Sequence, residues 1–276
     1  MAERLFLLVV VAGALVYARG LVRCWRVAGE HRLISPAQAI AFAGALVVLV
    51  VALEPPLDSV VTTNLPAHMV QHVLLLAVVP PLLAYSAPLT VGMFALPDRA
   101  RLRVQPVWRR VLRSQEQRAW FAWTVLAFAL ANLTLAAWHI PGAYDAAVRN
   151  SAVHVLEHAS FVATATFFWW MVLGAGRRER RGLGVLGVFI STLPATALGL
   201  LMTLAATSWY APYGHGATAV RNQQVAGAVM WGFGGLALVM GAAALFAGWL
   251  AAMDRADERA RVRERERAHT SGVVPS

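Results

Sequence analysis

The sequence predicts an all-α integral membrane protein: a bundle of seven transmembrane helices with its N-terminus outside and its C-terminus in the cytoplasm. Three observations support this fold class. The chain of 276 residues is 59% hydrophobic, whereas a soluble domain is about 45–50% apolar. Apolar runs of about 20 residues, the length that crosses a bilayer, recur along it. Basic residues fall in short blocks between these runs, and the runs should be helical because hydrocarbon offers backbone amides no partner.

Seven apolar runs are predicted to span the membrane. In chain order they lie near residues 5–22, 36–53, 66–90, 119–138, 152–173, 184–206 and 225–252. The third carries Pro80 and Pro81 at its middle and should kink or break there, and Pro194 should bend the sixth. The remaining residues, 253–276, mix Arg with Glu and then turn polar, which predicts a charged cytoplasmic tail that is partly disordered.

The distribution of arginine sets the direction of the helices. Of the 24 basic residues, all but Arg4, Arg149 and Arg221 lie in the first, third and fifth connections and in the tail. Cytoplasmic loops carry an excess of arginine, so these segments are expected inside. The net charge of +10 is then a topology signal, and nucleic acid is not expected as a partner. The alternative is a cleaved signal peptide over residues 5–18, which would break this alternation.

Six of the eight histidines are predicted to lie at the outer face. HMVQH opens the third helix and HVLEH opens the fifth, and each motif places two histidines on one helix face. A further histidine ends the fourth helix, and His215 lies in the last outer loop, where a hydrogen bond at the headgroups is the simplest role. The two pairs and the histidine of the fourth helix share one depth, which predicts a metal site with the ligands His68, His72, His139, His154 and His158.

Other polar and sulfur-containing side chains reach a similar depth. Polar groups inside a membrane are costly unless they have partners, so they are functional candidates. For the methionines among them, core packing is the alternative. The supporting candidates are Gln71, Glu157, Gln223, Met202 and Met230.

The ligand types favour copper. Histidine and thioether ligands without thiolate, on the oxidising side of a membrane, suit this metal, although imidazole also suits zinc. Cys24, the single cysteine, excludes a Cys-rich site. Haem is a second alternative, because His72 and His158 come from different helices and could bind it axially.

HVLEH also matches the H-x-x-E-H pattern of the inverted zinc peptidases, with Glu157 as the general base. An intramembrane zinc hydrolase is therefore a further hypothesis. Against it, the acids that follow are Glu179, in a predicted cytoplasmic loop, and those of the tail. None of these could serve a site at the outer face.

Three stretches resemble the CtaG-type cytochrome c oxidase assembly factors. They are HMVQHVLLLAVVPPLLAYSAPL at 68–89, WHIPGAYDAAVRNSAVHVLEHASFVATATFFWW at 138–170 and NQQVAGAVMW at 222–231. The resemblance covers roughly residues 30–250, and the family's histidine pattern maps onto the five predicted ligands. One departure is Asn222, where the family usually carries an acidic residue.

The resemblance implies a multi-pass protein of the bacterial plasma membrane that assists assembly of a haem–copper oxidase. Combined with the histidine pattern, it predicts copper held in the outer leaflet for the oxidase subunit that carries the haem–copper centre. No turnover chemistry is expected. A haem-binding membrane redox protein is the alternative, followed by the intramembrane zinc hydrolase.

Overall fold

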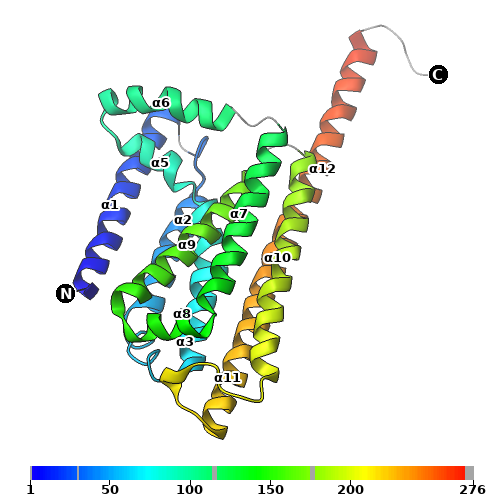
Figure 1. Cartoon of the computed structure of the whole chain (residues 1–276). Helices are drawn as coiled ribbons and strands as arrows, with labels where there is room; N and C mark the ends of the chain where they lie inside the picture. The colour runs from blue at the N-terminus through cyan, green and yellow to red at the C-terminus, as the bar shows by residue number, and fades with distance from the viewer. Residues whose placement is uncertain (1, 30, 114–116, 175–177, 271–276) are drawn as a thin grey trace.

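The computed structural model describes residues 2–29, 31–113, 117–174 and 178–270, and within these ranges the chain is helical with no strand. The long helices stand side by side, while α6 lies across one end of the bundle and α8 across the other (Figure 1). The predicted cytoplasmic Arg177 and the predicted tail residues 271–276 lie outside the described residues. In chain order the helices are α1 (Ala2–Ala28), α2 (Pro36–Leu53), α3 (Leu65–Val73), α4 (Val79–Tyr85), α5 (Pro88–Ala95), α6 (Asp98–Arg113), α7 (Gln117–Trp138), α8 (Pro141–Arg149), α9 (Ser151–Leu173), α10 (Arg178–Leu204), α11 (Ala217–Val229) and α12 (Gly235–Thr270).

Six stretches in the described part of the chain are long and apolar enough to cross a membrane. They are Phe6–Ala28, Pro36–Leu53, Leu65–Tyr85, Ala119–Trp138, Gly182–Leu204 and Ala217–Glu266. Each overlaps one predicted span. The predicted fifth span, 152–173, forms the helix α9, which has 23 residues, and its crossing of the membrane stays a prediction. It is not among the six because the polar residues of its first turns lower its hydropathy.

The two histidine-bearing helices begin in the same way. The Asn64 side chain caps α3 by accepting from Ala67 N, and the Asn150 side chain caps α9. An Asn cap fixes the first turn because its side-chain oxygen satisfies an orphan backbone N–H. His68 and His154 each follow four residues after the cap and donate their backbone N–H to its carbonyl. Both histidine pairs therefore occupy the first two turns of their helices.

The predicted third span is broken twice. A π-helical segment, Leu74–Val78, separates α3 from α4 just before Pro80, since proline has no N–H with which to continue the helical ladder. Helix α4 then ends at Tyr85, short of the predicted end at residue 90. Ala87 has a left-handed backbone (φ 49°), and Pro88 begins α5. Helix α5 folds back against α1, where the Tyr17 hydroxyl donates to Ser86 O (2.9 Å).

The helices that contain the last two predicted spans are longer than those spans. Helix α10 runs through Pro194 without ending there. The seventh begins at Ala217, passes a π-helical segment at Met230–Gly234, and continues as α12 past the predicted end near 252. Gly199 and Gly227 meet where α10 crosses α11, and a Cβ on either would collide with the opposite backbone. Small residues at a close crossing are typical of membrane helices, whose association depends on van der Waals contact.

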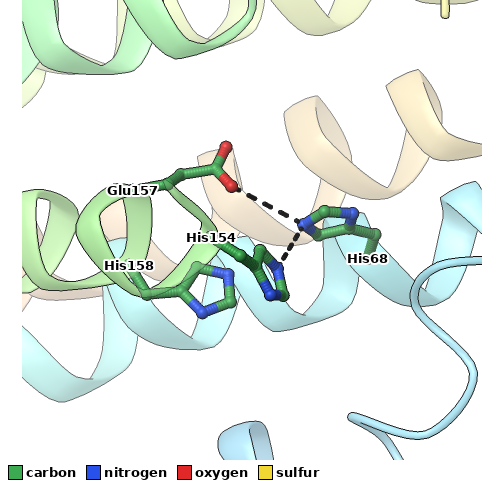
Figure 2. A group of neighbouring side chains, drawn as sticks. All are labelled: His68, His154, Glu157 and His158. Atoms are coloured by element: carbon green, nitrogen blue, oxygen red, sulfur yellow. Dashed lines mark hydrogen bonds and ion pairs between the residues drawn. The ribbon is translucent and has the colours of Figure 1, made fainter. Parts of the chain in front are cut away.

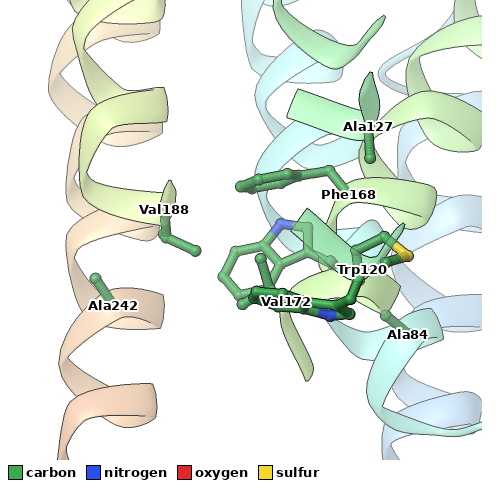
Figure 3. Close-up of a cluster of buried hydrophobic side chains, with 9 residues drawn as sticks. Ala84, Trp120, Ala127, Phe168, Val172, Val188 and Ala242 are labelled. Carbon is green, nitrogen blue, oxygen red and sulfur yellow. The ribbon is translucent and has the colours of Figure 1, made fainter. Parts of the chain in front are cut away.

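An aromatic core lies at the end of the bundle where α7 begins and α9 ends, and Figure 3 shows its side chains. We call it the tryptophan layer; it consists of Ala84, Trp120, Ala127, Phe168, Trp169, Met171, Val172, Val188 and Ala242. Helix α9 supplies four of these side chains from its last turns. The first turns of the same helix carry the HVLEH motif, so α9 connects the aromatic core to the histidines at the opposite end.

Candidate metal centre

Three histidines and a glutamate meet where the first turns of α3 and α9 lie together. His68 comes from α3, and His154, Glu157 and His158 come from α9. Their ligand atoms all lie within 4.8 Å of one another. Figure 2 shows His68 facing both the Glu157 carboxylate (4.0 Å) and His154 (Nε2 to Nε2, 3.2 Å). Glu157 is fully buried and His68 is 1% exposed.

The remaining two predicted histidine ligands extend this group. His72, one turn after His68 on α3, places Nε2 3.5 Å from Oε1 of Glu157. His139, just past the end of α7, has its ring centroid 5.6 Å from that of His72. The structure thus brings together all five histidines that the sequence singled out. We call the whole group the histidine cluster; it consists of His68, His72, His139, His154, Glu157 and His158.

Hydrogen bonds fix which nitrogen of His68 carries the proton. Its Nδ1 lies 2.8 Å from the Tyr213 hydroxyl, and that hydroxyl donates its own proton to Val61 O (2.8 Å). Burial raises the pKa of Tyr213, so the hydroxyl stays protonated. Tyr213 must therefore accept from Nδ1–H of His68, which leaves the Nε2 lone pair directed at His154 and Glu157.

A hydrogen bond also fixes the tautomer of His139. Its Nδ1 lies 2.8 Å from Leu135 O, which can only accept, so Nδ1 carries the proton and Nε2 has the lone pair. Burial, with a contribution from His72, lowers the pKa of His139 to about 3, and the imidazole is neutral. A neutral imidazole whose second nitrogen donates to a fixed acceptor is typical of metal-binding histidines.

The cluster contains buried polar atoms that the protein itself does not satisfy. Within the described residues, neither nitrogen of His72, neither oxygen of Glu157, nor Nε2 of His139 or His158 has a hydrogen-bond partner. Each unsatisfied buried polar group costs about 1–3 kcal/mol, and charged groups cost more. A cation bound among them would satisfy several at once, so the donor set fits a metal ion.

Two of the supporting candidates are hydrogen-bonded to neighbouring segments, Gln71 to the end of α2 and the loop after it, and Gln223 to the loop before α11. Gln71 donates to Ala52 O (2.7 Å) and to Asp58 Oδ1 (2.9 Å). Gln223 accepts from Trp209 N (2.7 Å) and donates to Thr207 O (3.1 Å). Both amides hold the loops that border the cluster, and their role as ligands stays a prediction.

The two methionines are buried in an apolar cluster beside the histidines, together with Tyr144 and Tyr210. Met202 is fully buried there. Met230 also lines a cavity of about 80 Å³ that His72 borders as well. This shared cavity makes Met230 the better placed of the two thioethers. His215 is exposed and borders a separate surface depression with Arg221.

Sequence reasoning missed the tyrosines around the cluster. Tyr144, on α8, is fully buried with its ring centroid 5.1 Å from that of His68, and it stacks on Tyr210 (4.1 Å). The Tyr210 hydroxyl donates to His139 O (3.1 Å). The available signal was that Tyr144, Tyr210 and Tyr213 all fall in the two connections predicted at the histidine face.

Comparison with known proteins identifies the family. The searches of curated proteins and of solved structures found no significant match. The family of cytochrome c oxidase caa3 assembly factors (CtaG) matches residues 15–252, which include the entire histidine cluster. This match covers most of the chain and confirms the resemblance carried by the histidine motifs. The chain therefore belongs to the CtaG family of cytochrome c oxidase caa3 assembly factors.

Proposed function

We propose that this protein holds copper at the histidine cluster and assists its delivery to the oxidase. The observation that carries the proposal is the convergence of five imidazoles and one carboxylate on a buried site where several lone pairs lack partners. Copper binds more tightly than the other divalent first-row metals to such donors. The cluster contains no thiolate, which suits a site that must release its ion to a client.

Packing within the cluster supports a bare ion over a haem. The rings of His72 and His158 are in edge contact, with centroids 5.5 Å apart and planes at 87°. A haem held between them would need a flat slot at this contact. The position of Glu157, directed at two histidines, supports a ligand role over that of a general base acting on a water at an open coordination position. The protein acts in this proposal without turnover chemistry.

The path of the chain supports a proposal of seven membrane crossings. Helix α7 ends and α8 lies at the histidine end of the bundle, whereas α10 begins at the opposite end (Figure 1). The connection is α9, which at about 1.5 Å of rise per residue is roughly 35 Å long. Its polar residues are tolerated because neighbouring helices cover them, as expected for intramembrane ionisable groups.

The arginine distribution directs the N-terminus outward in a bacterial plasma membrane, with α6 and the C-terminal tail in the cytoplasm. The histidine cluster then lies towards the outer surface, a suitable depth for the oxidase subunit that carries the haem–copper centre. His154 is the least buried of the cluster's histidines and provides the entry point. A reporter enzyme active only outside the cytoplasm should work when fused after Asp145 and fail after Arg103; the reverse pattern would overturn this orientation.

The functional test uses cells that lack the gene and carry either the wild-type protein or a variant. Wild type should restore oxidase activity and the copper content of the purified oxidase. A His154→Ala/His158→Ala variant should restore neither, although it accumulates in the membrane. His215→Ala, at an exposed histidine outside the cluster, is the matched control and should behave as wild type. Full copper in the oxidase with the double variant would contradict the proposal.

A further inference from the structure

The histidine cluster offers more donors than one copper ion uses. Copper sites in proteins take about four ligands, while the cluster supplies five imidazoles and a carboxylate. The compact group of four residues excludes His72 and His139. Those two rings contact each other, and each presents at least one buried nitrogen without a partner in the described part of the chain. A single ion in the compact group would leave both unsatisfied.

The Glu157 carboxylate faces both halves of the cluster. Its Oε2 lies 4.0 Å from Nε2 of His68, and its Oε1 lies 3.5 Å from Nε2 of His72. Neither oxygen has another partner among the described residues. A carboxylate that presents one oxygen to each of two groups of ligands is suited to bridge two ions, and its negative charge reduces the repulsion between them. Paired metal ions in proteins lie about 3.5–4 Å apart, within the span of one carboxylate.

The inner half of the cluster has room for a further ligand. His72 borders the cavity of about 80 Å³ that Met230 also lines. Imidazole and thioether donors together suit copper, especially copper(I). The hydrogen bond of His139 Nδ1–H to Leu135 O leaves its buried Nε2 lone pair available to a metal ion.

We infer that the histidine cluster is a two-ion copper centre. Its outer subsite consists of His68, His154 and His158, its inner subsite of His72 and His139, and Glu157 bridges the two. This inference rests on the proposed copper function and adds the number of ions and their division between subsites. It gives a loaded protein one ion near the surface at His154 and a second ion deeper in the bundle.

The test measures copper per chain in the full-length protein, purified in detergent and loaded with copper under reducing conditions. Wild type should bind two ions. His72→Gln and His139→Gln, two independent changes of the inner subsite, should each bind one, and His215→Gln should bind two. If wild type binds one ion per chain and both inner variants also bind one, the second ion is ruled out and the proposed function stands. No copper in wild type would overturn both.

Magnetic resonance tests the bridge independently. When both ions are oxidised to copper(II), coupling through Glu157 should weaken the paramagnetic signal of wild type well below two spins per chain. The single ion left in His139→Gln should give the full signal of one isolated copper(II). Two isolated full-intensity signals from wild type would overturn the bridging role of Glu157.

Discussion

The tryptophan layer and the histidine cluster occupy opposite ends of one bundle and share α9. Both are buried to a similar degree: Trp169 is 3% exposed and His158 is 6% exposed. The tryptophan layer is almost entirely carbon, and its rings fill space against neighbouring helices (Figure 3). The histidine cluster is nearly as enclosed, yet several of its nitrogen and oxygen atoms have no hydrogen-bond partner in the described part of the chain. Similar burial therefore hides a difference in chemistry: the tryptophan layer is packed carbon, and the histidine cluster presents donor atoms that fit a cation.

This difference separates stability from function along the same helix. Inside a membrane, apolar side chains gain little by leaving lipid, so the aromatic rings stabilise the fold mainly through van der Waals contact. Buried polar groups are costly without partners and are retained where they serve a function. Substitutions in the tryptophan layer should reduce stability, whereas substitutions in the histidine cluster should reduce metal binding.

The largest expected effect is that of Glu157→Gln. The amide has nearly the same shape but no charge, and one of its two groups cannot bind a cation. Loss of a residue that merely supports a metal ligand costs about 10–100-fold in affinity, and loss of a ligand should exceed that range. Copper titration of the purified variant should show this loss, while Asp145→Asn, on α8 and paired with Arg149, should leave affinity unchanged. If Glu157→Gln binds copper with wild-type affinity, the Glu157 carboxylate is not a copper ligand.

Trp169→Ala tests the contribution of the tryptophan layer to stability. The Trp169 ring lies against Gly241 of α12, where even a Cβ would collide with it, so its removal leaves a void at a close helix contact. A Trp→Ala change in a packed core costs about 3 kcal/mol of unfolding free energy. Thermal unfolding in detergent should occur at a lower temperature, while the copper bound per folded chain stays at the wild-type value. A parallel loss of copper would mean that the two regions are not separable.

Tyr213→Phe should have a smaller effect on the same site. It removes the hydroxyl that accepts from His68 Nδ1–H, so the tautomer of His68 is no longer fixed. Copper affinity should fall by about tenfold, the lower end of the range for residues that orient ligands. The control is Tyr85→Phe at an exposed tyrosine outside the cluster. Affinity equal to wild type would show that the tyrosine only fills space.

The smallest effect is expected for Cys24→Ser. Cys24 is buried on α1 with Ile34, Val91 and Tyr17, away from the histidine cluster. Copper content and oxidase activity should both equal those of wild type, as measured by metal analysis and oxygen consumption. Loss of copper in this variant would mean that the metal enters from the side that the arginines mark as cytoplasmic.

The sequence predicted the histidine cluster well because its main determinants are local. Residues four apart share a helix face whatever surrounds the helix, and both pairs begin four residues after an Asn cap. The depth of the histidines in the membrane was then predicted by counting residues along each span. The sequence also predicted a helix at 152–173, and the structure has α9 there.

Details that depend on how helices rotate against one another could not be read from the sequence. The position of Glu157 between His68 and His72 depends on the crossing of α3 and α9. The hydrogen bonds of Gln71 to the Asp58 side chain and of Gln223 to Trp209 N require the folded loops. The tyrosines had no periodic pattern to mark them, since they lie in short connecting elements whose paths are set by tertiary contacts.

The most direct test of the central claim is a metal analysis with an optical spectrum of the protein purified from copper-replete cells. Wild type should contain copper and show no Soret band, and the Glu157→Gln variant should have lost the copper. A strong Soret band would support a haem-binding redox protein. Zinc alone, or copper that remains after substitution within the histidine cluster, would contradict the assignment of this cluster as the copper site.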